Sequence, residues 1–299
     1  VQKRRVEDLP PPLTVVVPCF NEKDAIRPVL SRLETIVRDI GGEIVVVDDG
    51  STDGTAEILD RIAADDSAED SIVRVIHHGR NLGYGAAIKS GVRRARYQWI
   101  VITDADGTYP NDRIADLVAE AENADMVVGA RTQGDGGQPL LRRFAKGVLR
   151  AHCSWLVGEP IPDMNSGLRI FRKSVFEKFA KILPDGFSLT TTITVAMMRS
   201  RYRVVFLPIS YSERVGRSKI RPLRDTLGFL QLIVRTGMYF APLRVLLPLA
   251  TLLMVGFVGS MGYDLFVLQN LTDKTNLLFL FAVNTVLFGK LADMIDKRS

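Results

Sequence analysis

Carboxylates and glycines gather in four short segments of this 299-residue chain. The carboxylates are Glu22 in the first segment, Asp48 and Asp49 in the second, and Asp104 and Asp106 in the fourth. The third segment, Asn81–Ala87, contains two glycines. Carboxylates brought together repel each other unless something positive lies between them, and hard oxygen ligands suit a Mg²⁺ or Mn²⁺ ion that carries substrate phosphates. These residue types therefore indicate a site for a divalent cation and a phosphorylated ligand.

The residues between these segments must form the elements that position them. Runs rich in β-branched residues alternate with stretches of helical periodicity, which is typical of an α/β domain with a mostly parallel sheet. The expected strands are Leu13–Val17, Glu43–Val47, Ile72–Ile76, Trp99–Thr103 and Met126–Gly129. The expected helices are Asp24–Ile40, Gly54–Ala64, Gly85–Ala95 and Asn111–Glu122. Ligands bind beyond the carboxyl ends of such strands, and the four segments follow four successive strands there.

Each segment alone is a weak signal. The pair Asp53-Gly54 also fits a plain helix start, and Gly83 and Gly85 also fit ordinary turns rather than a phosphate cradle. An Asp-x-Asp sequence occurs by chance in many proteins. The order of the four segments at consecutive strand ends is what makes the joint prediction strong.

Composition excludes several protein classes. Apolar residues make up 46% of the chain and charged residues 24%, which excludes disorder and a small disulfide scaffold. Two cysteines and three histidines at scattered spacings make no zinc site. With no secretory signal ahead of them, we expect both cysteines to be reduced and the protein to be intracellular.

A basic run begins at Arg199 and ends at Arg224. It holds eight basic residues and one acid, a charge of +7 against +5 for the whole chain. Such a run attracts phosphates on nucleic acid, on lipid headgroups or on a substrate, although a merely solvated face is the plain alternative. We do not expect nucleic acid, because the run leads directly into apolar segments and no aromatic-lined groove is evident.

The C-terminal part changes character. Val245–Tyr263 contains no charge, and the apolar run resumes after Asp264. Thr275–Gly289 is a second such run, which reaches spanning length if Lys290 extends toward the headgroups. We expect a transmembrane hairpin with both ends in the cytoplasm, where basic residues flank it. A buried helical pair in a soluble domain is the alternative.

These patterns divide the chain into three parts. We expect residues 1–222 to form a cytoplasmic catalytic domain, residues 223–243 an interfacial helix that lies along the membrane surface, and residues 244–299 the two-helix hairpin.

Several motifs together resemble the family 2 glycosyltransferases. They are Val-Pro-Cys-Phe-Asn-Glu, Val-Val-Asp-Asp-Gly-Ser-Thr-Asp-Gly-Thr, Asn-Leu-Gly-Tyr-Gly-Ala-Ala and Asp-Ala-Asp-Gly. The segment Asp163–Arg172, the sequence Arg214-Val-Gly-Arg-Ser-Lys219 and the hairpin narrow the resemblance to polyprenyl (dolichyl or undecaprenyl) phosphate hexose synthases. The resemblance implies a GT-A fold, a nucleotide-sugar donor and a Mg²⁺ or Mn²⁺ ion.

The resemblance also implies roles for individual residues. The donor is bound by Pro18, Phe20, Asn21, Glu22, Asp48, Asp49, Asn81, Gly83, Lys89, Asp104, Ala105 and Asp106. Asp104 and Asp106 are the expected metal ligands. The acceptor phosphate is bound by Arg131, Arg214, Arg217, Ser218 and Lys219. The expected catalytic residues are Asp106, Asp163, Arg131, Arg217 and Lys219.

The implied reaction moves one hexose to a polyprenyl phosphate with inversion. A phosphate monoester has a second pKa of about 6, so the acceptor is already nucleophilic and needs no strong base. The Gln-x-x-Arg-Trp motif of processive members is absent, which favours a single transfer. Gly107-Thr108 after the Asp-x-Asp pair favours UDP-glucose slightly over GDP-mannose as donor. The resemblance also allows a homotetramer, because members of this family often assemble through their juxtamembrane and membrane helices.

Asp163 stays open between three roles: orienting a sugar hydroxyl, acting as a base, or capping a turn. If it is a base, the enzyme glycosylates a hydroxyl on a glycan or lipid instead of a phosphate. A membrane-tethered nucleotide-binding module without turnover is a further alternative, although it has no need of both Asp104 and Asp106.

Overall fold

The computed structural model describes residues 12–65, 71–132, 140–211 and 234–296. The chain divides into two compact units. The first unit comprises residues 1–144 and 160–221, and the second comprises residues 145–159 and 222–299.

The first unit is built on one seven-stranded sheet with the order β3-β2-β1-β4-β6-β5-β7. The strands are β1 (Leu13–Cys19), β2 (Glu43–Asp48), β3 (Val73–His77), β4 (Trp99–Ile102), β5 (Met126–Arg131), β6 (Arg169–Arg172) and β7 (Val204–Ile209). Every pair is parallel except the two pairs that β6 makes with β4 and β5. The predicted α/β class with a mostly parallel sheet is confirmed.

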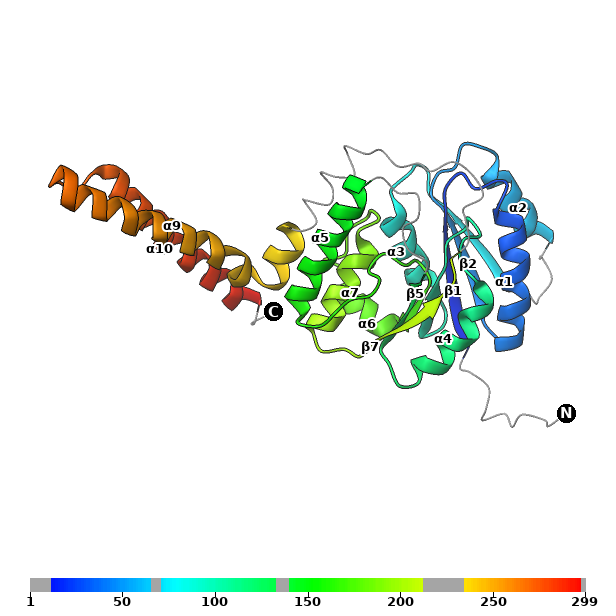
Figure 1. The fold of residues 1–299 in the computed structure, drawn as a ribbon. Helices are drawn as coiled ribbons and strands as arrows, with labels where there is room; N and C mark the ends of the chain where they lie inside the picture. The colour runs from blue at the N-terminus through cyan, green and yellow to red at the C-terminus, as the bar shows by residue number, and fades with distance from the viewer. Residues whose placement is uncertain (1–11, 66–70, 133–139, 212–233, 297–299) are drawn as a thin grey trace. The chain divides into compact units, whose positions relative to one another are not determined.

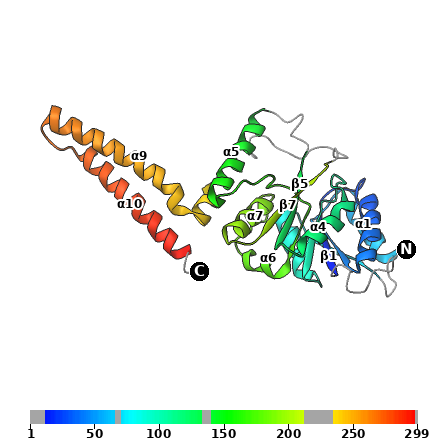
Figure 2. The same ribbon diagram turned by 60° about the horizontal axis from the view of Figure 1, so that its bottom comes forward.

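Helices cover both faces of this sheet (Figures 1 and 2). One face packs against α1 (Ile26–Ile40), α2 (Thr55–Asp65) and α4 (Ile114–Ala121). The other packs against α3 (Tyr84–Arg94), α6 (Lys173–Phe179) and α7 (Leu189–Arg199). The strand and helix positions expected from the sequence agree with these elements to within a few residues, except that a short 3₁₀-helix (Asn111–Arg113) precedes α4.

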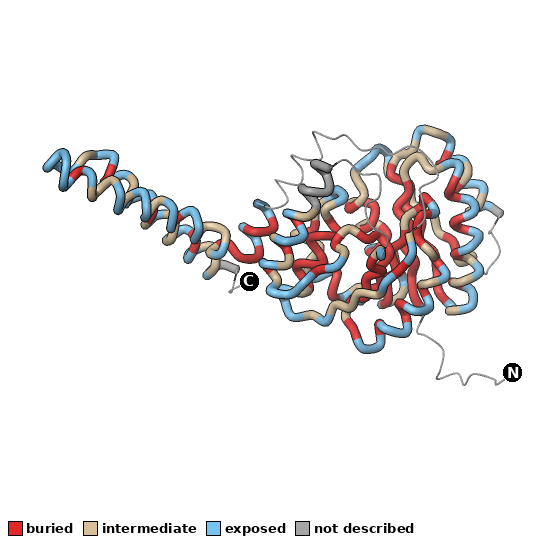
Figure 3. Tube along the Cα trace, viewed as in Figure 1, coloured by how far each residue is buried: buried red, intermediate tan, exposed pale blue. Residues whose placement is uncertain are grey.

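The central strands are apolar because both of their faces are covered. All residues of β1, β2 and β4 are buried, and Figure 3 shows the strands as the buried centre of this unit. Strands buried on both sides read as continuous Val and Ile runs rather than as alternating patterns, which is why the sequence revealed them. The four-residue strand β6 lacks such a run and was not predicted.

The second unit holds two long apolar helices, α9 (Pro242–Tyr263) and α10 (Asp273–Asp296). A π-helix (Asp264–Leu268) extends α9. The stretches Pro242–Leu268 and Asp273–Met294, with mean hydropathies of 2.0 and 1.6, are long and apolar enough to cross a membrane. This unit also contains the C-terminal part of α5 (Leu140–Val157), and residues 234–240 are helical.

Asp264 closes the turn between the two apolar helices. Its Oδ2 accepts hydrogen bonds of 2.7 Å from the Thr272 amide, the Thr272 hydroxyl and the Thr275 hydroxyl. A carboxylate at the end of an apolar helix is satisfied in this way at the N-terminus of α10, where unpaired amides and the helix dipole favour negative charge. Ser260 adds a 2.6 Å contact with the Thr275 hydroxyl.

Candidate active site

Of the predicted site residues, those that the structure describes lie at the carboxyl edge of the sheet, apart from Lys89 on α3 (Tyr84–Arg94). The carboxyl ends of β1, β2, β4 and β5 lie at this edge. β1, β2 and β4 run parallel to one another, and β5 runs in the same direction because β4 and β5 both pair antiparallel with β6. The antiparallel β6 begins there, since Arg169 pairs with Ile102 near the end of β4 and with Val128 near the end of β5. The segment that precedes β6, with Asp163, therefore joins the segments that follow β4 and β5.

The loops after β1 and β2 are bound to each other. Asn21 has a positive φ of 53°, a conformation that asparagine tolerates better than most residues. The Asn21 backbone amide donates to the Ser51 hydroxyl at 2.9 Å, and the Asn21 side-chain Oδ1 accepts the Thr52 backbone amide at 2.7 Å. The Glu22 amide donates to the Thr55 hydroxyl at 3.0 Å. Two of the predicted donor-binding segments thus form one ordered wall.

Asp49 is buried and binds the loop that follows β3. Its carboxylate accepts the Leu82 amide at 2.9 Å and the Gly83 amide at 2.8 Å, and it lies 2.7 Å from His78 Nδ1. The Gly83 amide therefore points at Asp49. Gly83 also has a φ of +107°, and a Cβ there would lie 2.5 Å from the Asp185 carbonyl oxygen, so this position requires glycine.

Asp48, also buried, is held in a similar way. Its Oδ1 accepts the Ser51 amide at 3.1 Å and its Oδ2 lies 3.0 Å from His77 Nδ1. The second nitrogen of His77 lies 3.0 Å from Asp60. Asp48 and Asp49 thus order the two loops that follow β2 and β3.

Asp104 lies between two neighbours that restrict its carboxylate. The Tyr84 hydroxyl donates to Asp104 Oδ1 at 2.9 Å. Gly167 approaches so closely that a Cβ there would lie 2.6 Å from the same oxygen. Burial first, and then the charge of Asp104, hold the pKa of Tyr84 well above its ordinary value, so Tyr84 keeps its proton and donates.

Asp106 is 8% exposed and is ordered by its own loop. Its Oδ1 accepts the Thr108 amide at 3.2 Å and the Thr108 hydroxyl at 2.7 Å. Asp104 and Asp106 therefore follow β4 as two fixed carboxylates, as the Asp-x-Asp spacing predicts.

Arg131 and Asp163 form a two-pronged ion pair. Arg131 Nε donates to Oδ2 at 2.7 Å and Nη2 donates to Oδ1 at 2.9 Å. The amides of Arg131 and Asn165 add hydrogen bonds of 3.2 and 3.0 Å. Burial alone would raise the pKa of Asp163, but the hydrogen bonds and charge of Arg131 hold it below its ordinary value. Asp163 is thus a stabilised anion and a weak base.

Arg169 is a fully buried cation that binds the same segment as Asp163. Its guanidinium donates to the carbonyl oxygen of Ser166, to the Thr190 carbonyl oxygen at 3.1 Å and to the Thr194 hydroxyl at 3.2 Å. These bonds join the Asp163–Gly167 segment to the start of α7. The Gly167 amide in turn donates to the Tyr109 hydroxyl at 2.7 Å.

The other predicted residues are placed as follows. Pro18 and Ala105 are buried, Phe20 and Glu22 are half-buried at the site, and Asn81 is exposed at its rim. Lys89 Nζ donates to the Leu183 carbonyl oxygen and to Asp185 at 2.8 Å, so it binds the segment before α7. The predicted basic residues Arg214, Arg217, Ser218 and Lys219 lie outside the described residues.

Sequence reasoning missed Tyr84, Tyr109, Gly167, Arg169 and the two histidines. His77 ends β3 and His78 follows it, at the same edge as the aspartates, so the rule that selected Asp48 and Asp49 would have found them. Tyr84 lies inside the Asn81–Ala87 motif. The role of Gly167 carried no signal in the sequence, because it depends on an approach between residues far apart in the chain.

The donor set at this edge fits a hard divalent cation that needs substrate phosphates. Asp104 and Asp106 supply carboxylate oxygens, and Mg²⁺ usually takes one or two carboxylates together with phosphate oxygens. No cluster of three or more His, Cys, Asp or Glu side chains that could hold a metal occurs in the described ranges. Such a pair is suited to an ion that arrives with a diphosphate.

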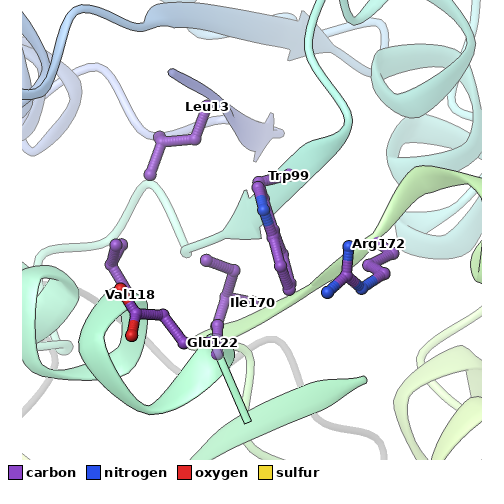
Figure 4. A pocket seen from close by; sticks show the side chains of 7 residues that line it. Leu13, Trp99, Val118, Glu122, Ile170 and Arg172 are labelled. Carbon is purple, nitrogen blue, oxygen red and sulfur yellow. The ribbon is translucent and has the colours of Figure 1, made fainter. Parts of the chain in front are cut away.

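A cavity of about 250 Å³ lies elsewhere (Figure 4). Leu13 and Trp99, the first residues of β1 and β4, line it, so it lies at the amino edge of the sheet, opposite the edge that holds the carboxylates described above. The guanidinium carbon of Arg172 lies over the Trp99 ring, 4.3 Å from the ring centroid. The cavity is therefore separate from the carboxylate site.

The chain matches known proteins over most of the first unit. The family described as Glycosyl transferase family 2 matches residues 14–180. A dolichyl-phosphate hexose transferase of Haloferax volcanii is 32% identical over 214 residues, which cover 70% of this chain and 87% of the relative. An undecaprenyl-phosphate 4-deoxy-4-formamido-L-arabinose transferase of Pseudomonas fluorescens is 30% identical over 246 residues, covering 78% and 67%. A polyprenol monophosphomannose synthase of Mycolicibacterium smegmatis is 29% identical over 216 residues, covering 69% and 80%.

Solved structures share the fold. Glucosyl-3-phosphoglycerate synthase from Mycobacterium tuberculosis, in complex with Mn²⁺, UDP-glucose and phosphoglyceric acid, has a TM-score of 0.58 at 19% identity, covering 79% of this chain and 85% of that one. The predicted GT-A fold is thereby confirmed. The match of fold, motif order and sequence over more than half of the chain places this protein in glycosyl transferase family 2, and it is a glycosyltransferase.

Proposed function

We propose that this enzyme moves one hexose from a nucleotide sugar to a polyprenyl phosphate at a membrane surface, with inversion at the anomeric carbon. The relatives named for transfer to dolichyl, undecaprenyl and polyprenol phosphates support the acceptor class. The two helices long enough to cross a membrane support the location. The proposed parts are a catalytic domain of residues 1–222, an interfacial helix of residues 223–243 and a membrane hairpin of residues 244–299.

The ion pair of Arg131 with Asp163 is the observation that carries the acceptor assignment. Transfer to a hydroxyl requires a base to remove its proton, whereas a phosphate dianion attacks without one. Asp163 is held as a stabilised anion by Arg131, which disfavours the base role. We assign Asp163 to positioning Arg131, whose guanidinium compensates the charge of the two phosphorylated reactants.

The reaction then needs positioning and charge compensation. An oxygen of the acceptor phosphate attacks the anomeric carbon in line, the bond to the donor's β-phosphate oxygen breaks, and the nucleoside diphosphate leaves with that electron pair. Asp104 and Asp106 would hold Mg²⁺ or Mn²⁺, which supplies positive charge to the departing diphosphate. Arg214, Arg217, Ser218 and Lys219 are proposed to bind the acceptor phosphate.

We further propose UDP-glucose as the donor. Gly107-Thr108 after the Asp-x-Asp pair favours UDP-glucose, with GDP-mannose next. The cytoplasmic orientation of the catalytic domain rests on the basic residues that flank the apolar helices. A homotetramer stays a prediction.

Product formation from a panel of radiolabelled nucleotide sugars tests the proposal. Each is supplied with Mg²⁺ or Mn²⁺ to membranes containing either a polyprenyl phosphate or the corresponding polyprenol. Label that enters the lipid fraction only with the phosphate supports the proposed reaction and identifies the sugar. Label that enters with the alcohol, or only after a glycan is added, contradicts it and makes Asp163 the base to test.

A further inference from the structure

Large exposed apolar side chains are rare on the first unit. Within its described residues, the exposed large hydrophobic side chains are Leu82, which is 47% exposed, and Phe187, which is 81% exposed. A single exposed apolar residue needs no explanation, but exposed apolar residues that gather beside a site indicate an apolar ligand.

The two residues lie on segments that are packed together. A Cβ at Gly83 would lie 2.5 Å from the Asp185 carbonyl oxygen, and one at Gly85 would lie 2.3 Å from the Pro184 carbonyl oxygen. The Ala86 amide donates to the Asp185 carbonyl oxygen at 3.1 Å. Leu82 directly precedes the segment Gly83–Ala86, and Phe187 lies two residues after Asp185. Both residues therefore belong to one rim of the site.

Phe187 is held in place although it is exposed. Its ring stacks on the Tyr84 ring, with centroids 5.3 Å apart and planes 19° from parallel. The Tyr84 hydroxyl donates to Asp104 Oδ1 at 2.9 Å. The exposed ring is therefore tied, through one side chain, to a carboxylate that we assign to the donor diphosphate and its cation.

We propose that Leu82 and Phe187 form the contact for the first isoprene units of the acceptor lipid. The inference rests on the proposed function and adds a subsite to it. A nucleotide sugar is polar at the diphosphate and hexose, whereas the isoprenoid chain begins at the acceptor phosphate and is wholly apolar. Two side chains are also far too small a surface for a protein partner, because a standard interface buries about 800 Å² on each side.

Kinetics of substituted enzymes test this subsite. The full-length enzyme is assayed in mixed micelles at constant detergent, with undecaprenyl phosphate varied by mole fraction and then the nucleotide sugar varied. Phe187→Ala should raise the KM for the lipid about five- to tenfold and leave the KM for the nucleotide sugar unchanged. Leu82→Ser should act in the same direction. Phe187→Leu, which keeps an apolar side chain, should recover most of the lost affinity.

Gly186→Ala is the matched control on the same segment. A Cβ at Gly186 would meet no atom within 4 Å, so this variant should match the wild type in both constants. Unfolding is not expected to confuse the result, because the Phe187 ring is mostly exposed and its loss leaves little cavity.

Two results would overturn the inference. One is an unchanged KM for the lipid in Phe187→Ala, and the other is a raised KM for the nucleotide sugar alone, which would assign the ring to the donor. Failure of the proposed function is a separate result, since the wild-type enzyme would then make no product from undecaprenyl phosphate at all.

Discussion

At the scale of single residues, the candidate site is organised by carboxylates that bind protein groups. Asp49 accepts two backbone amides, Asp104 accepts the Tyr84 hydroxyl, and Asp163 binds Arg131 through two hydrogen bonds. A carboxylate restrained in this way has little freedom left to lose when a ligand arrives, which is the advantage of a preorganised site.

The Arg131 pair gives a prediction for stability and its pH dependence. Asp163→Asn removes a charged acceptor and should lower the free energy of unfolding by about 2 kcal/mol near neutral pH. Because the pKa of Asp163 is lowered in the folded state, its contribution is complete above the unfolded value of 3.8 and is lost as the pH falls through the lower folded value. The difference in stability between wild type and variant should therefore shrink below about pH 4.

Denaturant unfolding of both proteins from neutral to acidic pH measures this. A gap that stays constant down to strongly acidic pH would show that the charge of Asp163 is not what stabilises the segment. Activity should fall in the same variant, because Arg131 loses the partner that fixes its guanidinium.

Asp106→Asn should abolish turnover while the fold is retained. The amide keeps the oxygen that accepts the Thr108 hydroxyl and amide, but it is a poorer ligand for a hard cation. Sugar transfer and Mn²⁺-dependent nucleotide binding by calorimetry both report the loss. Asp112→Asn, an exposed change on the neighbouring 3₁₀-helix, is the control and should behave as wild type. Near-normal, metal-dependent turnover in Asp106→Asn would remove this residue from the proposed role.

At the scale of elements, the start of α3 and the segment before α7 must fit together closely. Gly85→Ala should push that segment away, since the added Cβ would lie 2.3 Å from the Pro184 carbonyl oxygen. Overpacking of this kind costs roughly 1–3 kcal/mol. We expect a lower melting temperature and a reduced rate of transfer, because a shift of α3 would move Tyr84 and weaken its hydrogen bond to Asp104.

Gly79→Ala is the matched control for this change. A Cβ at Gly79 would meet no atom within 4 Å, so neither the melting temperature nor the rate should change. If Gly85→Ala also left both unchanged, the backbone approach would not be what requires glycine there.

At the scale of the whole molecule, the proposed membrane attachment depends on residues after the catalytic unit. The intact protein should stay with membranes through an alkaline carbonate wash, because two helices of spanning length hold it. A chain ended after Arg221 should be released by the same wash yet still bind nucleotide. Release of the intact protein would indicate that the two apolar helices do not span the bilayer.

The same truncation should also destabilise the C-terminal part of α5. Residues 145–159 belong to the second unit, where Arg244 donates to the Trp155 carbonyl oxygen at 3.2 Å. Removing residues 222–299 takes away these partners, so amide hydrogen exchange in residues 145–159 should accelerate. Unchanged exchange would show that α5 is stable without residues 222–299.

The sequence alone indicated the α/β class and the family, and it predicted a site at the carboxyl edge of the sheet. Each depends on local pattern, because buried parallel strands read as Val and Ile runs and the residues after them must meet at one edge. It also indicated the apolar hairpin, since length and hydropathy decide whether a helix can span a membrane.

Only the tertiary structure decided which residues these groups contact. Asp163 was open between three roles until Arg131 was found bound to it, 32 residues away in the chain. Gly167 and Arg169 became part of the site only because the antiparallel strand β6 brings their segment against the end of β4, and Tyr84 because it begins α3 within hydrogen-bonding distance of Asp104. Contacts between residues distant in sequence depend on packing, which no local pattern of residues records.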